Sequence, residues 1–372
     1  MTKQFAPEHV RALSPYQAGK PISEVAREFG LDEANIIKLA SNENPFGVPE
    51  SAKLAMLAAA EELGRYPDAN GFDLKAALAK RYDVPQSWIT LGNGSNDILE
   101  IAAHTFVQHG QAIMYAQYSF AIYALAAQGV GARHIVVPAR QYGHDLTAMA
   151  AASTAAGSAD LRLIFIANPN NPTGTFVPAA EMAAFLAQVP ANVVVVLDEA
   201  YNEFLKPEDQ FESAAWVKQY PNLVVSRTFS KAYGLAGLRV GFAIAQPELT
   251  DLMNRIRQPF NVNSMAQAAA IAALNDTAFL DKGARNNAAG YQQFTEAFEA
   301  LGLNYVPSHG NFVLVQVGTD DGAGARVNLE LLKQGVIVRP VGNYGLPQWL
   351  RISIGLPQEN AVLIAALTKA LG

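Results

Sequence analysis

Lys231 has neighbours that favour a chemical role over a surface role. A lone lysine in a loop is usually a solvated charge, but Lys231 is flanked by Phe229, Tyr233 and Leu235, in a segment with hydroxyls, arginine and almost no acids. Burial near an arginine lowers the pKa of a lysine from its usual value of about 10.4 and makes the neutral amine available for imine formation. The segment therefore predicts a site for an anion and an aldehyde.

Asp198 is a second candidate, because it directly follows the apolar run 193–197, which shows no polar alternation. Such a run is typical of a strand buried on both faces. A carboxylate at its end is costly unless it meets a cation, and a protonated pyridine nitrogen would serve. A structural ion pair and a metal ligand are the competing explanations. Metal is the weaker one, since no histidine lies within the next turn and Glu199 and Glu203 need not share a face with Asp198.

Two further polar segments follow apolar runs. Segment 168–174 contains two prolines, which fix the backbone and could aim one of its asparagine amides at a ligand oxygen. Segment 92–97 opens an expected helix, so a phosphate could bind at Ser95 and Asn96, where free backbone N–H groups and the helix dipole favour an anion. Ordinary turn chemistry and a serine-capped loop remain the alternatives for these segments taken alone.

The elements that must position these residues indicate an α/β protein. Short apolar runs alternate with helical stretches, which predicts βαβ units and a mostly parallel sheet, with ligands beyond the carboxyl ends of its strands. The clearest expected strands are 161–167, 193–197, 223–226, 312–317 and 350–354. The clearest expected helices are 51–63, 71–81, 96–107, 178–188 and 276–301.

The pattern of helix-like and strand-like runs divides the chain into three expected parts. We expect an N-terminal arm at 1–45, a large domain at 46–258 and a smaller α+β domain at 259–372, where a long alanine-rich helical stretch precedes two strand-like runs. With 372 residues, half of them hydrophobic, the chain is long enough for two cores.

Composition excludes several classes of function. Charged residues are only 16% and the net charge is -6, so nothing favours binding to nucleic acid or to a membrane surface. The absence of cysteine excludes disulfides, thiolate nucleophiles and cysteine-ligated metals. No stretch reads as a signal peptide or a membrane span, so we expect a soluble, cytoplasmic protein.

Several motifs together resemble one family. NPNNPTG, DEAY and TFSKAYGLAGLRVGF occur in the order that is typical of the fold-type I pyridoxal-phosphate-dependent aminotransferases of class I/II. KLASNENPFG, GNGSNDIL and VIVRPVGNYGLPQWLRISIG narrow the resemblance to the histidinol-phosphate aminotransferase family, over about residues 38–355. The resemblance implies an α/β fold with a mostly parallel central sheet in a large domain and a smaller α+β C-terminal domain.

The resemblance also implies roles for residues around the cofactor, pyridoxal 5'-phosphate. Lys231 would hold it as an internal aldimine, and Asp198 would pair with its pyridine nitrogen. Asn171 and Tyr201 would bond its phenolic oxygen, and Tyr118 would stack on its ring. Its phosphate would be held at the helix start and by the segment that contains the lysine, through Ser95, Asn96, Thr228, Ser230 and Arg239.

Substrate and partner residues follow from the same resemblance. Arg351 matches the arginine that grips the substrate α-carboxylate, and Arg339 matches the one that contacts a substrate phosphate. Tyr16 and Asn42 would close the pocket. Tyr66 resembles a tyrosine that reaches the cofactor phosphate from the partner subunit, which implies a homodimer with shared sites.

The expected reaction is a transamination between L-histidinol phosphate and 2-oxoglutarate, giving imidazole-acetol phosphate and L-glutamate in histidine biosynthesis. An aromatic amino-acid aminotransferase is the main alternative, because relatives of the family accept phenylalanine or tyrosine in a similar pocket. A lyase or decarboxylase of a phosphorylated amino acid would use the same scaffold. A non-catalytic regulator would need a DNA-binding module, for which the about 40 residues before the first motif leave little room.

Overall fold

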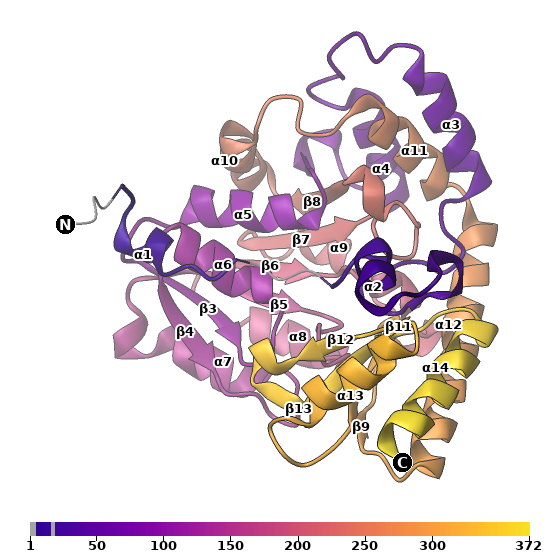
Figure 1. The fold of residues 1–372 in the computed structure, drawn as a ribbon. Coiled ribbons are helices and arrows are strands. Elements are labelled where there is room, and N and C mark those ends of the chain that lie inside the picture. The colour runs from indigo at the N-terminus through magenta and orange to yellow at the C-terminus, as the bar shows by residue number, and fades with distance from the viewer. Residues whose placement is uncertain (1–4, 16–18) are drawn as a thin grey trace.

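The structure is a computed structural model that describes residues 5–15 and 19–372, so Tyr16 lies outside the described residues. Figure 1 shows a central sheet between layers of helices, with a smaller sheet and its helices, coloured orange to yellow, beside it. In the larger part, the carboxyl ends of the parallel strands carry most of the candidate site residues. The smaller part lies against these ends.

A seven-stranded sheet forms the centre of the larger part (Figure 1). Its order is β2-β8-β7-β6-β5-β3-β4, and only β8 runs opposite to the others. The bounds are β2 (Ile89–Gly92), β3 (Ala112–Ala116), β4 (Arg133–Val137), β5 (Leu161–Ala167), β6 (Val194–Asp198), β7 (Leu223–Thr228) and β8 (Gly241–Ala245). Because β5, β6 and β7 are parallel neighbours, their carboxyl ends meet at one edge of the sheet.

Helices cover both faces of this sheet. One face carries α5 (Ser95–Phe106), α6 (Ala121–Gly129) and α10 (Pro247–Ile256), with α1 (Glu8–Arg11) beside α6. The other face carries α4 (Phe72–Tyr82), α7 (Leu146–Thr154), α8 (Ala179–Leu186) and α9 (Ser213–Trp216), and α11 (Ser264–Leu274) with α3 (Glu50–Ala60) packed on it. The predicted parallel α/β architecture is therefore confirmed.

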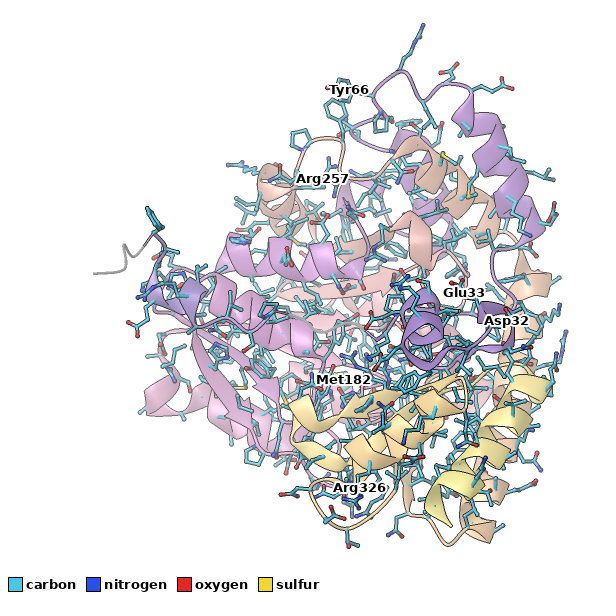
Figure 2. The ribbon with its side chains drawn as sticks, in the orientation of Figure 1. Asp32, Glu33, Tyr66, Met182, Arg257 and Arg326 are labelled. Carbon is cyan, nitrogen blue, oxygen red and sulfur yellow. The ribbon has the colours of Figure 1, made fainter. Side chains whose placement is uncertain are left out.

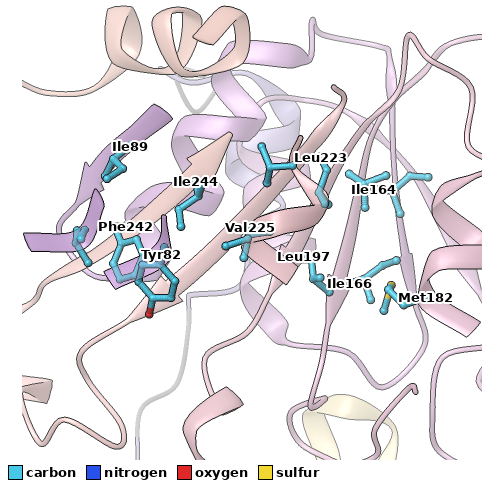
Figure 3. Packing of buried hydrophobic residues seen from close by; sticks show 14 of the residues in the cluster. Tyr82, Ile89, Ile164, Ile166, Met182, Leu197, Leu223, Val225, Phe242 and Ile244 are labelled. Carbon is cyan, nitrogen blue, oxygen red and sulfur yellow. The ribbon is translucent and has the colours of Figure 1, made fainter. Parts of the chain in front are cut away.

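Side chains of the sheet alternate between two cores. On β5, Leu163 and Phe165 join the cluster under α5 and α6, while Ile164 and Ile166 join the cluster on the opposite face. Successive side chains of a strand point to opposite faces, so an uninterrupted apolar run requires helices on both. Figure 3 shows part of the second cluster, where Ile166 lies beside Met182 of α8.

The smaller part is built on a four-stranded antiparallel sheet in the order β12-β13-β10-β9. Its strands are β9 (Tyr305–Val306), β10 (Phe312–Gln316), β12 (Arg339–Val341) and β13 (Leu346–Ser353). The helices α12 (Thr277–Ala300), α13 (Ala323–Lys333) and α14 (Pro357–Leu371) bury Phe294, Leu331 and Leu363 against it. This packing holds β12 and β13 in place within the smaller part.

The N-terminal segment joins the smaller part. There α2 (Ile22–Phe29) packs on Leu332 and Ile337, and β1 (Ile37–Lys38) pairs in parallel with β11 (Val336–Ile337). The division of the chain at residue 258 stays a prediction, although α11, which it assigns to the smaller domain, packs on α3 and α4. No helix among the described residues is long and apolar enough to cross a lipid bilayer.

Candidate active site

A cavity of about 240 Å³ opens where the ends of β5, β6 and β7 meet the smaller part. Most of the residues that we predicted for the site line this cavity, although they come from segments that are far apart in the chain. They are Asn42, Ser95, Asn96, Asn171, Asp198, Tyr201, Thr228, Ser230, Lys231, Arg239, Arg339 and Arg351. Tyr118 and Tyr66 do not line it.

Lys231 lies in the turn after β7, on the wall of the cavity. Its Nζ donates to the backbone oxygen of Ser41 at 3.0 Å and lies 5.8 Å from the ring centroid of Tyr201. Burial lowers the pKa of Lys231 to about 7, and the positive charge of Arg351 adds to this effect. A large fraction of the amine is therefore neutral and nucleophilic near pH 7.

Asp198 is the last residue of β6 and is buried. The hydroxyl of Tyr123, whose ring stacks on Phe165, donates to Asp198 Oδ2 at 3.0 Å. Oδ1 has no hydrogen-bond partner among the described residues. Burial raises the pKa of Asp198 to about 7, while the bond from Tyr123 opposes this rise. The free, buried oxygen is suited to a cationic N–H donor on a ligand.

A hydrogen-bond network connects Arg351 of β13 with the loop after β5. Arg351 Nη1 donates to Asn171 Oδ1 and Nη2 donates to the backbone oxygen of Ala40, both at 2.6 Å. Asn171 Nδ2 donates to the Tyr201 hydroxyl at 3.2 Å, and Asn42 Nδ2 donates to the same oxygen at 2.9 Å. Amide, phenol and guanidinium groups thus form one wall of the cavity.

The start of α5 forms a cradle for an anion. A Cβ at Gly94, which has a φ of 80°, would lie 2.3 Å from Arg239 Nη2, and a Cβ at Gly241 would lie 2.6 Å from the backbone nitrogen of Ser95. Arg239 Nη1 donates to Ser230 Oγ at 3.2 Å. Glycine at both positions lets the guanidinium, the hydroxyl and the helix start converge, which is a suitable donor set for a phosphate.

A buried ion group holds the ends of β6 and β7 behind the cavity. Arg227 Nη2 pairs with Glu199 Oε2 at 2.7 Å, and Nη1 lies 3.4 Å from Glu203 Oε1. The structural ion pair that was an alternative for Asp198 is therefore made by its neighbour Glu199. Within residues 5–15 and 19–372, no group of three or more histidine, aspartate and glutamate side chains could hold a metal ion.

Tyr118, which we expected to stack on the cofactor ring, does not line the cavity, and its stacking role stays a prediction. Tyr118 has a φ of 57°, and its ring packs against Tyr142, 6.1 Å away between centroids, in a cluster with Trp349. Phe120, which directly precedes α6, lines the cavity instead. Tyr118 packs with side chains of the smaller part, and Phe120 is the aromatic residue of this loop in the cavity lining.

Tyr66 lies far from the cavity of its own chain. Figure 2 shows it at an outer end of the molecule, where its ring stacks on Phe260 with a centroid distance of 4.7 Å. The residue is 82% exposed. It can take part in a site only if a second chain covers this surface.

Comparisons with known proteins agree with this geometry. The family model described as aminotransferase class I and II matches residues 34–367. The chain is 72% identical to histidinol-phosphate aminotransferase 2 of Ralstonia nicotianae, covering 100% of this chain and 98% of the relative. It is also 72% identical to histidinol-phosphate aminotransferase 1 of Cupriavidus pinatubonensis, covering 99% and 96% of the two chains.

A solved structure is similar over nearly the whole chain. It is the histidinol-phosphate aminotransferase from Sinorhizobium meliloti in complex with pyridoxal-5'-phosphate, with a TM-score of 0.91 and 30% sequence identity. The match covers 99% of this chain and 98% of that one.

Proposed function

This chain belongs to the class I and II aminotransferases, and we propose that it transfers the amino group of L-histidinol phosphate to 2-oxoglutarate, in histidine biosynthesis. It is a pyridoxal-phosphate-dependent enzyme. The products would be imidazole-acetol phosphate and L-glutamate. The observation that carries the choice of substrate is the presence of two buried arginines, Arg339 and Arg351, side by side in the cavity.

The residues of the cavity fit pyridoxal phosphate. The free Oδ1 of Asp198 suits its ring nitrogen, and the cradle of Ser95, Ser230 and Arg239 suits its phosphate. Lys231 lines the same cavity and would attach the cofactor covalently through Nζ. Asn96 and Thr228 would add donors for the phosphate, and Phe120 would pack on the ring.

The chemistry that pyridoxal phosphate supplies when bound is an aldehyde that takes up amino groups and a ring that withdraws electrons. Asp198 keeps the ring nitrogen protonated, because its carboxylate stabilises the adjacent positive charge. Lys231 Nζ would hold the cofactor and, as a neutral amine, would be the base that takes the proton from the substrate Cα. Asn171 and Tyr201 hold the phenolic oxygen and thereby orient the ring.

The substrate would be held by the two arginines of the smaller part. Arg351 would exchange its neutral acceptors, Asn171 Oδ1 and the Ala40 oxygen, for an anionic group of the bound molecule, such as the α-carboxylate of 2-oxoglutarate or L-glutamate. Arg339, on the neighbouring strand, would bind the phosphate of histidinol phosphate. An amino donor without a phosphate would leave Arg339 without this anion.

A homodimer is part of the same proposal. Leu54 and Leu57 on α3 are 61% and 67% exposed, and Tyr66 follows this helix in the chain. Monomers rarely leave such a group of apolar side chains in water, which supports a second copy of this chain as its cover. Tyr66 would then complete the phosphate site of the partner.

Two measurements on the purified protein test this function. Addition of pyridoxal phosphate should produce a visible absorbance band, and borohydride should then fix the cofactor on the Lys231 peptide, as detected by mass spectrometry. With 2-oxoglutarate as acceptor, kcat/KM for L-histidinol phosphate should exceed that for L-phenylalanine by at least ~10-fold. A preference for phenylalanine would favour the aromatic alternative, and carbon dioxide release without 2-oxo acid would favour a decarboxylase.

A further inference from the structure

The hydroxyl oxygen of Tyr201 receives two hydrogen bonds from amide groups. Asn42 Nδ2 lies 2.9 Å from it and Asn171 Nδ2 lies 3.2 Å from it. Tyr201 itself is buried and lines the cavity. Both of these bonds are accepted by the Tyr201 oxygen. Among residues 5–15 and 19–372, no group accepts a hydrogen bond from the Tyr201 O–H.

The orientation of both amides follows from their other partners. A guanidinium can only donate, so the contact of Arg351 Nη1 with Asn171 fixes that amide with its oxygen towards the arginine and its nitrogen towards Tyr201. Ser353 Oγ accepts from the backbone N–H of Asn42 at 2.8 Å and donates to Asn42 Oδ1 at 2.9 Å. Only this orientation gives the serine proton an acceptor in the network, so Asn42 Nδ2 faces Tyr201.

Asn42 is held firmly enough to direct another side chain. It is 1% exposed, and Asn311 Nδ2 donates to its backbone oxygen at 3.1 Å. Its φ of 53° lies in the left-handed region, which asparagine tolerates better than most residues. The position therefore combines an unusual backbone with a side chain fixed at both ends of its amide.

We propose that Asn42 is a positioning residue that fixes the Tyr201 hydroxyl as a hydrogen-bond donor towards the cavity. With two donors on its oxygen, the phenol can only donate its own proton, and the phenolic oxygen of the cofactor is the acceptor that the cavity would offer. This inference rests on the proposed function, because it requires bound pyridoxal phosphate. It replaces the expectation that Asn42 closes the substrate pocket.

The two amides also strengthen this donor. Burial raises the pKa of Tyr201 to about 12, whereas Arg351 and the hydrogen bond from Asn42 lower it. A phenol whose oxygen is stabilised by N–H donors gives up its proton more readily in a hydrogen bond. Donation to the phenolic oxygen of the cofactor competes with the proton held between that oxygen and the Lys231 nitrogen. Loss of the donor should therefore raise the pKa at which the visible band of the holoenzyme titrates.

The test is a double-mutant cycle read by pH titration of the visible absorbance of the holoenzyme. Asn42→Gly removes the amide and keeps the left-handed backbone accessible. We expect it to raise the pKa of the band in the same direction as Tyr201→Phe, by a smaller amount, and to have no further effect in the double variant. An unshifted band in Asn42→Gly, or additive shifts in the double variant, would overturn the inference.

Asn311→Ala is the matched control, because it removes the hydrogen bond to the backbone oxygen of Asn42 and leaves the side chains of Asn42 and Tyr201 unchanged. Because Asn311→Ala leaves the Asn42 amide in place, it should shift the titration less than Asn42→Gly does. Equal shifts would show that the backbone of the loop matters and not the amide, and would contradict the inference. If Asn42→Gly does not fold, Asn42→Asp keeps the shape and replaces the donor by an acceptor. Its shift is compared with that in the Tyr201→Phe background, which subtracts the effect of the added charge. A wild-type protein without a visible band would instead overturn the proposed function itself.

Discussion

Arg339 of β12 and Arg351 of β13 are directly opposite each other in an antiparallel strand pair. Residues in this relation point to the same face of the sheet, with Cβ atoms about 4.5–5.5 Å apart. Both side chains are 7% exposed and line the cavity. Two arginines buried on one face of a sheet are costly to desolvate, and anionic groups of a ligand are the strongest partners for them. The pair therefore suits ligands with anionic groups, as a phosphorylated amino donor and a dicarboxylic 2-oxo acid are.

The two arginines should differ in what they recognise. Arg339→Gln should lower kcat/KM for L-histidinol phosphate by about 100-fold, because a buried charge-assisted contact is lost, but should leave that for L-phenylalanine within a few-fold. Arg351→Gln should lower kcat/KM for 2-oxoglutarate with either donor. Arg326→Gln is the control, since Arg326 pairs with Asp320 at the surface (Figure 2). Equal losses for both donors in Arg339→Gln would contradict a phosphate-specific role.

The aromatic residue in the cavity can be identified by a pair of alanine variants. Phe120→Ala should weaken the equilibrium binding of pyridoxal phosphate about 10-fold, because the loss of a stacked ring costs about 0.5–1.5 kcal/mol beyond the buried area. Tyr118→Ala should lower the melting temperature, since its ring packs with Tyr142, and should bind the cofactor nearly as wild type does. The reverse result would restore the expectation from the sequence.

Much of the fold could be predicted because burial on two faces leaves a clear pattern. The expected strand 161–167 is β5, and the expected helix 276–301 is α12 within one residue at each end. Strand β13 begins at Leu346, four residues before the predicted start at 350. The prediction started late because Pro347 is typical of a turn and not of a strand interior. The reversed strand β8 was not predicted, since periodicity carries no information about strand direction.

The candidate site was predictable where one motif follows one strand, as for Asp198 and Lys231. Side-chain directions within a loop were not, and the left-handed turn at Tyr118 is the clearest case. Contacts between distant segments were also not predictable. The bond from Asn42 to Tyr201 joins residues that are 159 positions apart, and the bond from Tyr123 to Asp198 arises only when α6 packs on the sheet.

The pH dependence of cofactor attachment should report the state of Lys231. Burial and the charge of Arg351 lower the pKa of this lysine to about 7, so the neutral amine predominates above that pH. The rate at which the apoprotein develops the visible band with pyridoxal phosphate should rise about fivefold from pH 6 to 7 and level off above about pH 8. A rate that keeps rising towards pH 10 would show a lysine with an ordinary pKa.

Hybrid dimers can test whether Tyr66 serves the neighbouring site. Lys231→Ala inactivates the site of its own chain, whereas Tyr66→Ala would damage the site of the partner. In a mixed dimer of the two variants, a shared-site arrangement places both defects in one site and leaves the other site intact. Coexpression of equal amounts should therefore give about a quarter of the wild-type activity, because about half of the dimers are mixed and each has one working site. In the control experiment, Lys231→Ala is coexpressed with Leu329→Ala in place of Tyr66→Ala. Leu329 is an exposed apolar residue of α13. If the tyrosine acted within its own chain, the mixed dimers would add nothing to the activity of the separately expressed variants.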